Sequence, residues 1–273
     1  MPCFNIAFGY KAGCTLNAGD SNIFLGQYAG MCQTTATNNI FLGRRAGQYF
    51  VGGGSQVFIG NDAGRKMCDG YQNVALGYSA LRGSSTVSDN TGENNVSLGS
   101  QSGEALTSGD YNVFLGYYAG KTITSGAQNI AIGQASMGSG TVTGSRNVVI
   151  GCSAGKKITS ALNNVLVGTD VACCLTSGAL NIALGYQAGK ESIKEGHRNI
   201  VIGRSAEVPI INGSDQLAIG CETCNWIVGN KNFNVGIGTT NPDPAVGVGN
   251  TAKLSVGIVS AYQFYGDGSN LTG

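Results

Sequence analysis

The amino-acid sequence predicts an all-β protein: a parallel β-solenoid (β-roll) of about thirteen 17-residue coils, assembled as an elongated homotrimer with a small β-rich C-terminal tip. Three observations lead to this prediction. A short motif recurs at a fixed period, its residues alternate as in a β-strand, and the predicted strand is apolar on both faces. A solenoid grows by adding coils, so a chain of 273 residues need not divide into globular domains.

The recurring motif is Asn–apolar–x–apolar–Gly, first seen at Asn5–Gly9. The spacing between closing glycines is 17 residues, except for two steps of 18 and one of 22. These structural glycines are Gly9, Gly26, Gly43, Gly60, Gly77, Gly99, Gly116, Gly133, Gly151, Gly168, Gly185, Gly203 and Gly220. Numbering each repeat from its glycine as zero, we expect this residue to take a positive φ where the chain turns. The repeat region is residues 1–220.

Positions −3 and −1 are aliphatic or Phe in every repeat, as at Ile6 and Phe8, which indicates a β-strand. We expect these two side chains to fill the solenoid. Position +3 is usually Ala and +7 usually apolar, which favours a second short strand before the next turn. Coils stacked about 4.8 Å apart would make a rod on the order of 60 Å long. The Asn at −4 recurs at equivalent places, so we expect a ladder of stacked amides.

Position −2 lies between two core positions and should point the opposite way. It is nevertheless apolar in nearly every repeat, which is typical of a strand buried on both faces. We therefore expect the larger residues at −2 to contact another copy around a symmetry axis. The trimer-facing candidates are Phe24, Phe41, Phe58, Phe114, Val149, Leu166 and Val201.

Positions +1 and +2 vary widely and are expected to be exposed. Their tyrosines, such as Tyr117 and Tyr118, could contact glycans, although scattered exposed tyrosines are ordinary. The step of 22 residues places an insertion within 84–94, which we expect to form a loop on one face. After Gly220 the rhythm breaks, and residues 221–273 are predicted to form a separate cap or tip.

Composition excludes several classes of protein. The 16 Lys and Arg residues are dispersed and the net charge is +1, so we expect no nucleic-acid partner. No apolar run is long enough for a membrane span, and the residues after Met1 do not resemble a signal peptide. Nine cysteines at irregular spacings do not suggest a disulfide framework and fit folding in a reducing cytosol.

No catalytic, metal or cofactor site is predicted, and we expect a protein that is not an enzyme. Cys221 and Cys224 form one C-x-x-C without the second pair that a zinc site needs. His197 is the single histidine and belongs to no nucleophile–base set. The run 267–270 offers too few oxygens for a calcium site. Glycan cleavage would require carboxylates from different chains.

Two resemblances add to these expectations. The repeat, for example Asn129-Ile130-Ala131-Ile132-Gly133, resembles the head of trimeric autotransporter adhesins. In that family the coils form a left-handed parallel β-roll and three chains pack together, although the repeat is shorter. The run Val235–Pro242, together with Lys253–Val256 and Gly266–Gly273, is similar to phage tail-fibre and tail-spike proteins. There, such a segment commonly precedes a chaperone that trimerises the fibre and cleaves itself off.

The leading functional expectation is a structural fibre protein on the surface of a phage virion, made in the host cytoplasm and mediating adhesion to the host surface. Its partners would be two further copies of itself, other fibre or virion subunits and a host surface glycan. A bacterial trimeric adhesin head and a tail spike that degrades glycans are the alternatives. A monomeric ice-binding solenoid would need a regular Thr ladder, and Thr at +8 is intermittent.

Overall fold

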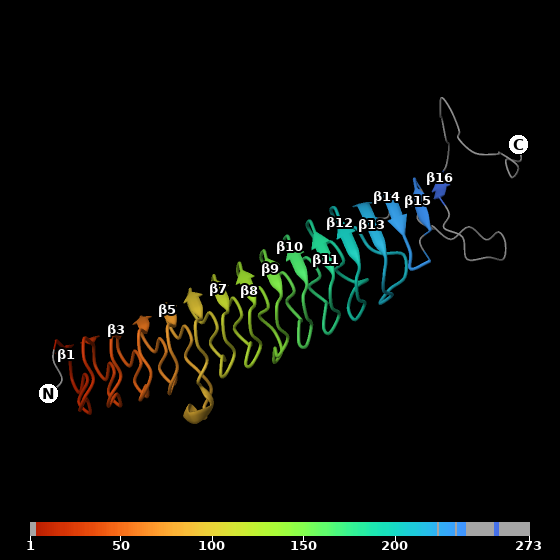
Figure 1. The fold of residues 1–273 in the computed structure, drawn as a ribbon. Helices are drawn as coiled ribbons and strands as arrows, with labels where there is room; N and C mark the ends of the chain where they lie inside the picture. Colours follow the sequence, from red (N-terminus) through yellow and green to blue (C-terminus); the bar gives the residue numbers. More distant parts are fainter. Residues whose placement is uncertain (1–3, 223, 233, 239–253, 257–273) are drawn as a thin grey trace, which may run out of the picture.

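The computed structural model describes residues 4–222, 224–232, 234–238 and 254–256. These residues form a rod of stacked coils with the strands along one side (Figure 1). One sheet contains sixteen strands in sequence order. They are β1 (Ile6–Phe8), β2 (Ile23–Leu25), β3 (Ile40–Leu42), β4 (Val57–Ile59), β5 (Val74–Leu76), β6 (Val96–Leu98), β7 (Val113–Leu115), β8 (Ile130–Ile132), β9 (Val148–Ile150), β10 (Val165–Val167), β11 (Ile182–Leu184), β12 (Ile200–Ile202), β13 (Leu217–Cys221), β14 (Cys224–Gly229), β15 (Val235–Ile237) and β16 (Leu254–Val256).

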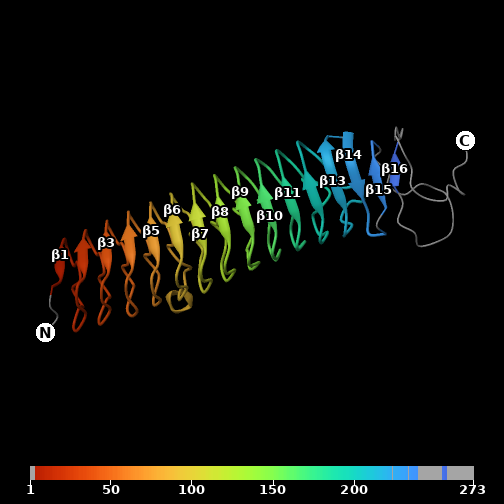
Figure 2. The same cartoon turned by 45° about the horizontal axis from the view of Figure 1, so that its top comes forward.

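Strands β1 to β13 are parallel and paired in the register of the repeat. Val113 lies opposite Ile130, and Phe114 lies opposite Ala131, so equivalent motif positions stack directly on one another. The view in Figure 2 shows the same side-by-side order from a second direction. The prediction of a parallel β-solenoid with coils of about 17 residues is therefore confirmed.

The coil has a simpler path than predicted. The first twelve repeats each contain one strand of three residues, and the thirteenth contains β13, of five residues. The predicted second strand is absent from the described repeats apart from isolated bridges such as Thr37 to Gly54. The reason is a series of residues with positive φ, which interrupt extended backbone. In the repeat closed by Gly116, Tyr118 has φ 62°, Gly120 has φ 58° and Gln128 has φ 59°. The chain returns to the next strand through these turns.

The predicted amide ladder is present and lies inside the rod. The Asn129 Nδ2 donates to Asn112 Oδ1 at 3.2 Å and to the Gly144 carbonyl at 2.9 Å. Its Oδ1 accepts from the backbone N–H of Asn147 at 3.0 Å and from the Asn147 Nδ2 at 3.1 Å. The fully buried asparagines of this row are Asn22, Asn39, Asn73, Asn95, Asn112, Asn129, Asn147, Asn164, Asn181 and Asn199. Gln56 and Gln216 take the same position in two coils.

The orientation predicted for the strand is wrong. The supposed trimer-facing residues have an exposed fraction of 0% within the single chain, so they point into the solenoid and cannot contact a second copy. These are Phe24, Phe41, Phe58, Phe114, Val149, Leu166 and Val201. Alternation explains the inversion, because −4 and −2 are two residues apart and share a face. Once the Asn amide is inside, −2 is inside and positions −3 and −1 face outward.

Core residues at −2 and +4 compensate for each other in size. A Cβ on Gly30 would lie 2.8 Å from the Phe24 ring, so glycine at +4 makes room for a large ring at −2. Where −2 is the small Ala75, position +4 holds the buried Leu81; Ala131 is matched in the same way by Met137. In these coils a large side chain at one of the two positions is therefore matched by a small one at the other.

The glycine that closes each strand has a positive φ, between 118° and 143°, in the twelve repeats from Gly9 to Gly203. Space is also restricted there, because a Cβ on Gly133 would lie 2.6 Å from the carbonyl oxygen of Gly151. Gly220 is the exception to the predicted positive φ. It lies within β13, where the chain continues into a hairpin rather than turning into another coil.

The predicted insertion forms a loop on the side of the rod away from the sheet (Figure 1). It contains the short 3-10 helix η1 (Val87–Asp89). The buried Asn90 holds the loop together, since its Nδ2 donates to the carbonyls of Lys66 and Thr86. Its Oδ1 accepts from the backbone N–H of Ser84 at 2.9 Å.

Strand direction changes after β13. β14 is antiparallel to β13, with an irregularity at Ile219/Gly220, and β15 is antiparallel to β14. β16 is then parallel to β15. Most of the C-terminal run that resembles phage fibres, including the acidic 267–270, lies outside the described residues. The domain boundary at residue 220 stays a prediction.

Replacing Asn129 by Ala should lower the free energy of unfolding by about 2 kcal/mol or more. The change leaves the Gly144 carbonyl and the Asn147 backbone N–H buried without their partner, and each such group costs about 1–3 kcal/mol. The neighbouring exposed Gln128 provides the control, and Gln128→Ala should have little effect. Urea denaturation followed by circular dichroism measures both. Equal midpoints for the two variants would contradict a stabilising ladder.

The inverted orientation of the strand predicts opposite results for adjacent residues. Phe41 is fully buried and stacks between Phe24 and Phe58, with ring centroids 5.3 and 5.0 Å away. Phe41→Lys should prevent folding because the core offers no partner for a charge. Leu42→Lys, one residue further on the outer face, should retain the β circular dichroism spectrum. A folded Phe41→Lys protein together with an unfolded Leu42→Lys protein would restore the original assignment of the two faces.

Candidate interaction surface

The outer face of the sheet carries two continuous rows of apolar side chains, which we call the apolar stripe. It comprises positions −3 and −1 of every repeat, and none of its members is polar or charged. These residues are Ile6, Phe8, Ile23, Leu25, Ile40, Leu42, Val57, Ile59, Val74, Leu76, Val96, Leu98, Val113, Leu115, Ile130, Ile132, Val148, Ile150, Val165, Val167, Ile182, Leu184, Ile200, Ile202, Leu217 and Ile219.

The stripe remains accessible even where neighbouring coils flank it on both sides. Leu76 is 46% exposed, Val165 is 38% exposed and Ile200 is 39% exposed. Thirteen strands spaced about 4.8 Å apart, with two side-chain rows, give a surface of roughly 600 Å². This is as large as the largest apolar patches of ordinary monomers and close to the ~800 Å² that each partner buries in a stable interface.

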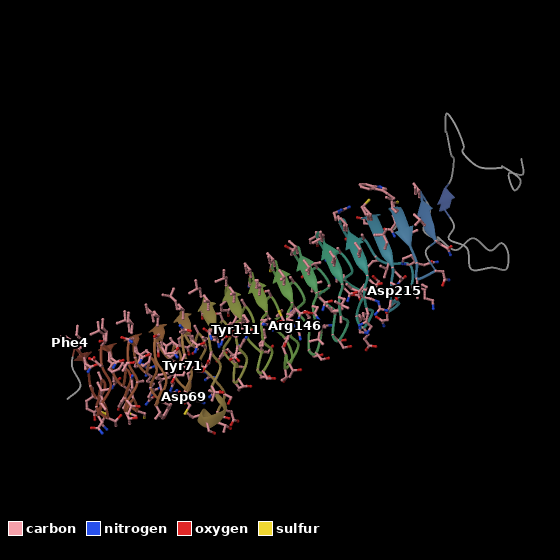
Figure 3. The ribbon with its side chains drawn as sticks, viewed as in Figure 1. Phe4, Asp69, Tyr71, Tyr111, Arg146 and Asp215 are labelled. Carbon is pink, nitrogen blue, oxygen red and sulfur yellow. The ribbon has the colours of Figure 1, made fainter. Side chains whose placement is uncertain are left out.

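Polar residues border the stripe. On one side runs position −5, which has positive φ and is mostly polar and exposed. Its members from β2 onward are Ser21, Asn38, Ser55, Gln72, Asn94, Tyr111, Gln128, Arg146, Asn163, Leu180, Arg198 and Asp215. Figure 3 shows Tyr111, Arg146 and Asp215 following one another along the rod. An apolar centre with a polar rim is the usual anatomy of a protein interface.

An ion pair lies on this rim near the end of the parallel stack. The Arg198 guanidinium donates from Nε to Asp215 Oδ1 at 2.6 Å and from Nη2 to Oδ2 at 2.9 Å. The hydrogen bond from Arg198 lowers the pKa of the Asp215 carboxyl, and the same bond raises the pKa of Arg198. Both groups are exposed, so this pair orients side chains rather than adding much stability.

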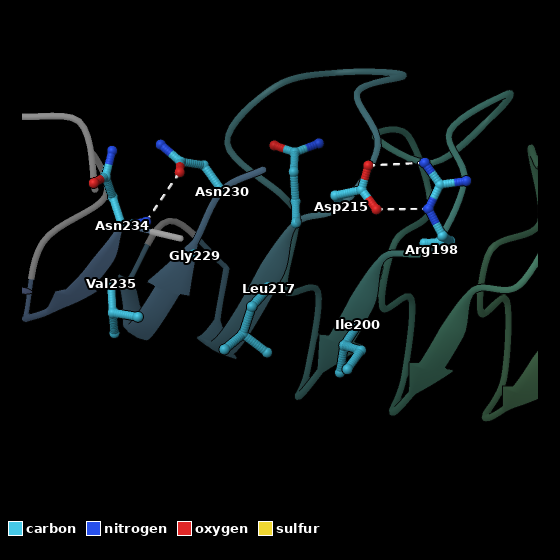
Figure 4. Close-up of a pocket in the computed structure, with 9 residues that line it drawn as sticks. Arg198, Ile200, Asp215, Leu217, Gly229, Asn230, Asn234 and Val235 are labelled. Atoms are coloured by element: carbon cyan, nitrogen blue, oxygen red, sulfur yellow. Dashed lines mark hydrogen bonds and ion pairs between the residues drawn. The ribbon is translucent and has the colours of Figure 1, made fainter. Parts of the chain in front are cut away.

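The stripe has a notch next to this ion pair (Figure 4). Gly229 of β14 lies opposite Leu217 on one side and Val235 on the other. Because glycine has no side chain, the row of large residues is interrupted there and a hollow of about 330 Å³ remains. Its apolar floor includes Ile200, Leu217 and Val235.

The predicted glycan-contacting tyrosines lie in a charged cluster on the turns. The rings of Tyr117 and Tyr118 stack at 3.9 Å, and Lys121 Nζ lies 3.9 Å from the Tyr118 ring centroid. Lys121 also pairs with Glu104, which Arg82 contacts at 3.0 Å. Stacked rings beside hydrogen-bonding groups suit a sugar, but glycan contact stays a prediction.

The structure describes eight of the nine cysteines and the single histidine. All cysteines of the described residues are free, and there no group of three or more His, Cys, Asp or Glu is placed to hold a metal ion. Burial and the neighbouring Cys174 raise the pKa of the Cys173 thiol to about 11, which favours the protonated thiol at neutral pH. The His197 Nδ1 accepts from the Ala179 backbone N–H at 3.1 Å, which is a structural role.

In the structure, the inner and outer faces of the strand are thus the reverse of the prediction. The candidates at −2 lie together in the core, and the surface available to a partner consists of −3 and −1, which were expected to be internal. The Asn at −4 was the signal that could have identified the inner face of the strand. It lies two residues before −2, so an inward Asn places −2 inside as well. Within the described ranges no helix is long and apolar enough to cross a membrane.

Comparison with known proteins identifies no relative. No protein-family model matches the chain, and neither the curated proteins nor the solved structures provide a significant match.

Proposed function

We propose that this chain is a structural fibre protein of a phage virion that assembles lengthwise as a homotrimer and contributes to adhesion to the host surface. The observation that carries the proposal is the apolar stripe. It extends over all thirteen parallel strands, contains no charge, and leaves aliphatic residues such as Leu76 accessible in the middle of the rod. Only a partner with the same length and spacing can cover it throughout.

A second and third copy of the chain meet this requirement. Their strands have the same spacing, so the ridges and grooves between side chains match along the entire contact. Three narrow stripes can converge on one axis and enclose a common apolar core, with position −5 and the turns left in solvent. This arrangement agrees with the three-fold assembly implied by the resemblance to autotransporter heads and phage fibres.

The remaining surface supports an adhesive role. With the stripe at the axis, the turns that carry positions +1 and +2 form the outside of the fibre. Tyr117 and Tyr118 lie at positions +1 and +2 with Lys121 beside the Tyr118 ring, and the loop around η1 lies on the side of the rod away from the sheet (Figure 1). Aromatic faces and charged groups there suit a host surface glycan. Other fibre or virion subunits would attach at the ends of the rod.

A bacterial trimeric adhesin head is the second candidate, because the same stripe and the same repeat serve it equally well. The two candidates share the prediction of a trimer and differ in the structure to which the rod is attached. Labelling of purified phage particles and of bacterial surfaces with an antibody against the rod distinguishes them. Detection on cells alone would exclude the virion proposal.

Introducing charge into the stripe should remove the three-fold assembly without unfolding the chain. The double variant Ile130→Lys/Ile132→Lys should have one third of the wild-type mass by light scattering, relative to a chain mass of 27.8 kDa. Lysines on the outer face would be desolvated and unpaired at the axis. The exposed Gln134, on the adjacent turn, is the control, and Gln134→Lys should keep the wild-type mass.

Circular dichroism must show that both variants are folded. A wild-type protein that is a stable monomer would exclude the trimer. A wild-type mass of two chains, or a double variant that keeps the wild-type mass, would show that the stripe is not a three-fold interface.

A further inference from the structure

Position +1 forms the second rim of the apolar stripe, because the strand lies between −5 and +1 in every repeat. From β2 onward, only two repeats have a large apolar or aromatic residue at −5. These residues are Tyr111 and Leu180, whereas the other members of that row are polar. Both repeats also have Tyr at +1, namely Tyr117 and Tyr186. Tyr78 is the one further Tyr at +1 in this set of repeats.

All four side chains are open to solvent in the single chain. Tyr111 is 61% exposed and Leu180 is 53% exposed on one rim, and Tyr117 and Tyr186 are 47% and 48% exposed on the other. Leu180 also has an unfavourable backbone conformation, since its φ of 61° belongs to the left-handed region that Gly, Asn and Asp tolerate better. A half-exposed leucine in that conformation gains little burial within its own chain, which indicates a contact outside it.

The fold holds these residues at fixed heights along the rod. Leu180 N–H donates to the Leu162 carbonyl of the preceding coil at 3.0 Å. On the other rim, the Tyr117 ring stacks on the Tyr118 ring with the centroids 3.9 Å apart. Each pair lies on the two rims of one coil, at β7 and at β11, and these two coils are about 19 Å apart.

A stripe built from equivalent repeats leaves the height of a partner undetermined. Apolar side chains recur at every coil, so a second copy shifted by one coil, about 4.8 Å, covers nearly the same apolar surface. Closed three-fold symmetry requires unshifted copies, because a rotation about an axis along the rods changes no height. The interface therefore needs residues that distinguish the unshifted arrangement from the shifted ones.

We propose that Tyr111 of one copy packs against Tyr117 of the next copy, and Leu180 against Tyr186, and that these two contacts set the register of the homotrimer. The inference rests on the proposed three-fold assembly. Around such an axis, the −5 rim of each copy faces the +1 rim of its neighbour at the same height, so both contacts occur three times. Tyr117 lies at the margin of this contact, and the turn beyond it stays available to a glycan.

The unshifted arrangement matches both pairs along the whole stripe. A shift of one coil would replace both tyrosine partners by polar residues, since Leu180 would then face Thr169 or Arg204. The corresponding neighbours of Tyr111 would be Ser100 and Gln134. Shifts of two to five coils restore at most one of the two contacts, and a shift of six coils leaves nearly half of the stripe uncovered.

Charged residues on the two rims are compatible with this arrangement. Arg198 at −5 and Arg204 at +1 belong to the same repeat and would face each other across the contact. Each is already paired within its own chain, Arg198 with Asp215 and Arg204 with Glu222. The group of four has no net charge, so repulsion between the two arginines is small at physiological salt.

The first test is cross-linking of the double variant Tyr111→Cys/Tyr117→Cys with a short bis-maleimide. Denaturing electrophoresis should show covalent trimers, because the two substituted positions of neighbouring copies lie side by side. The control is Tyr111→Cys/Gln27→Cys, since Gln27 is an exposed +1 residue five coils away, about 24 Å. Wild-type protein treated in parallel gives the background from the native cysteines.

The second test separates assembly from folding. Leu180→Asn introduces a residue type better suited to a positive φ, so the chain should fold at least as well as the wild type. The assembly should nevertheless dissociate at a roughly tenfold higher concentration in light scattering, because each trimer loses three contacts with an aromatic ring. Asn163→Ser changes the −5 residue of the preceding repeat, opposite Thr169, and should leave this concentration unchanged.

Circular dichroism shows whether each variant is folded, and Leu180→Asn keeps the inference testable should the double variant fail to fold. A wild-type trimer whose double variant gives no covalent trimers above background would overturn the register assignment and leave the three-fold assembly in place. Dissociation of Leu180→Asn at the wild-type concentration would have the same meaning. A monomeric wild type would overturn both proposals.

Discussion

Burial of the amide at position −4 is the constraint on which the rest of the structure depends. Most of these Asn residues bond to the amide of the preceding coil and to a carbonyl across the cross-section, as Asn129 does with Asn112 and Gly144. Outside its short strand, a coil also bonds to its neighbours through backbone groups of the return path, as the Tyr118 N–H does to the Ser100 carbonyl and the Gly120 N–H to the Ser136 carbonyl. The Asn side chains supply hydrogen-bond donors and acceptors inside the coil, which the turns by themselves do not provide. Because the amides lie inside, they also determine which alternate residues of the strand point into the core and which point to the surface.

That division determines how the sequence can vary. Inward positions exchange volume with each other, so Phe at −2 requires glycine at +4, while Ala131 coexists with Met137. Outward positions −3 and −1 have no such partner inside the chain, yet they remain apolar throughout. Packing inside the chain does not require apolar residues at −3 and −1, so their presence in every repeat indicates a contact outside the chain. This regularity supports the proposed assembly more strongly than the exposure of any single residue.

The rod therefore has two surfaces with different chemistry. The apolar stripe suits lengthwise contact between copies, whereas the turns around Tyr117 and the η1 loop suit contact with solvent and glycans. The notch beside Gly229 marks the point where the stripe loses its regular spacing, because the chain reverses direction at β14. Lateral packing that depends on identical spacing should weaken beyond this point.

The sequence by itself determined the period, the parallel stacking of coils, the Asn ladder, the turn glycines from Gly9 to Gly203 and the looped insertion. All of these follow from residue type and spacing along the chain. Only the tertiary structure decided which side of the strand is internal. A strand that is apolar on both faces has no hydrophobic signal for that choice, and the buried amide bonds across the coil are long-range contacts. Tertiary structure also decided that one strand per coil suffices, since the positive φ angles near Tyr118 and Gln128 close the return path.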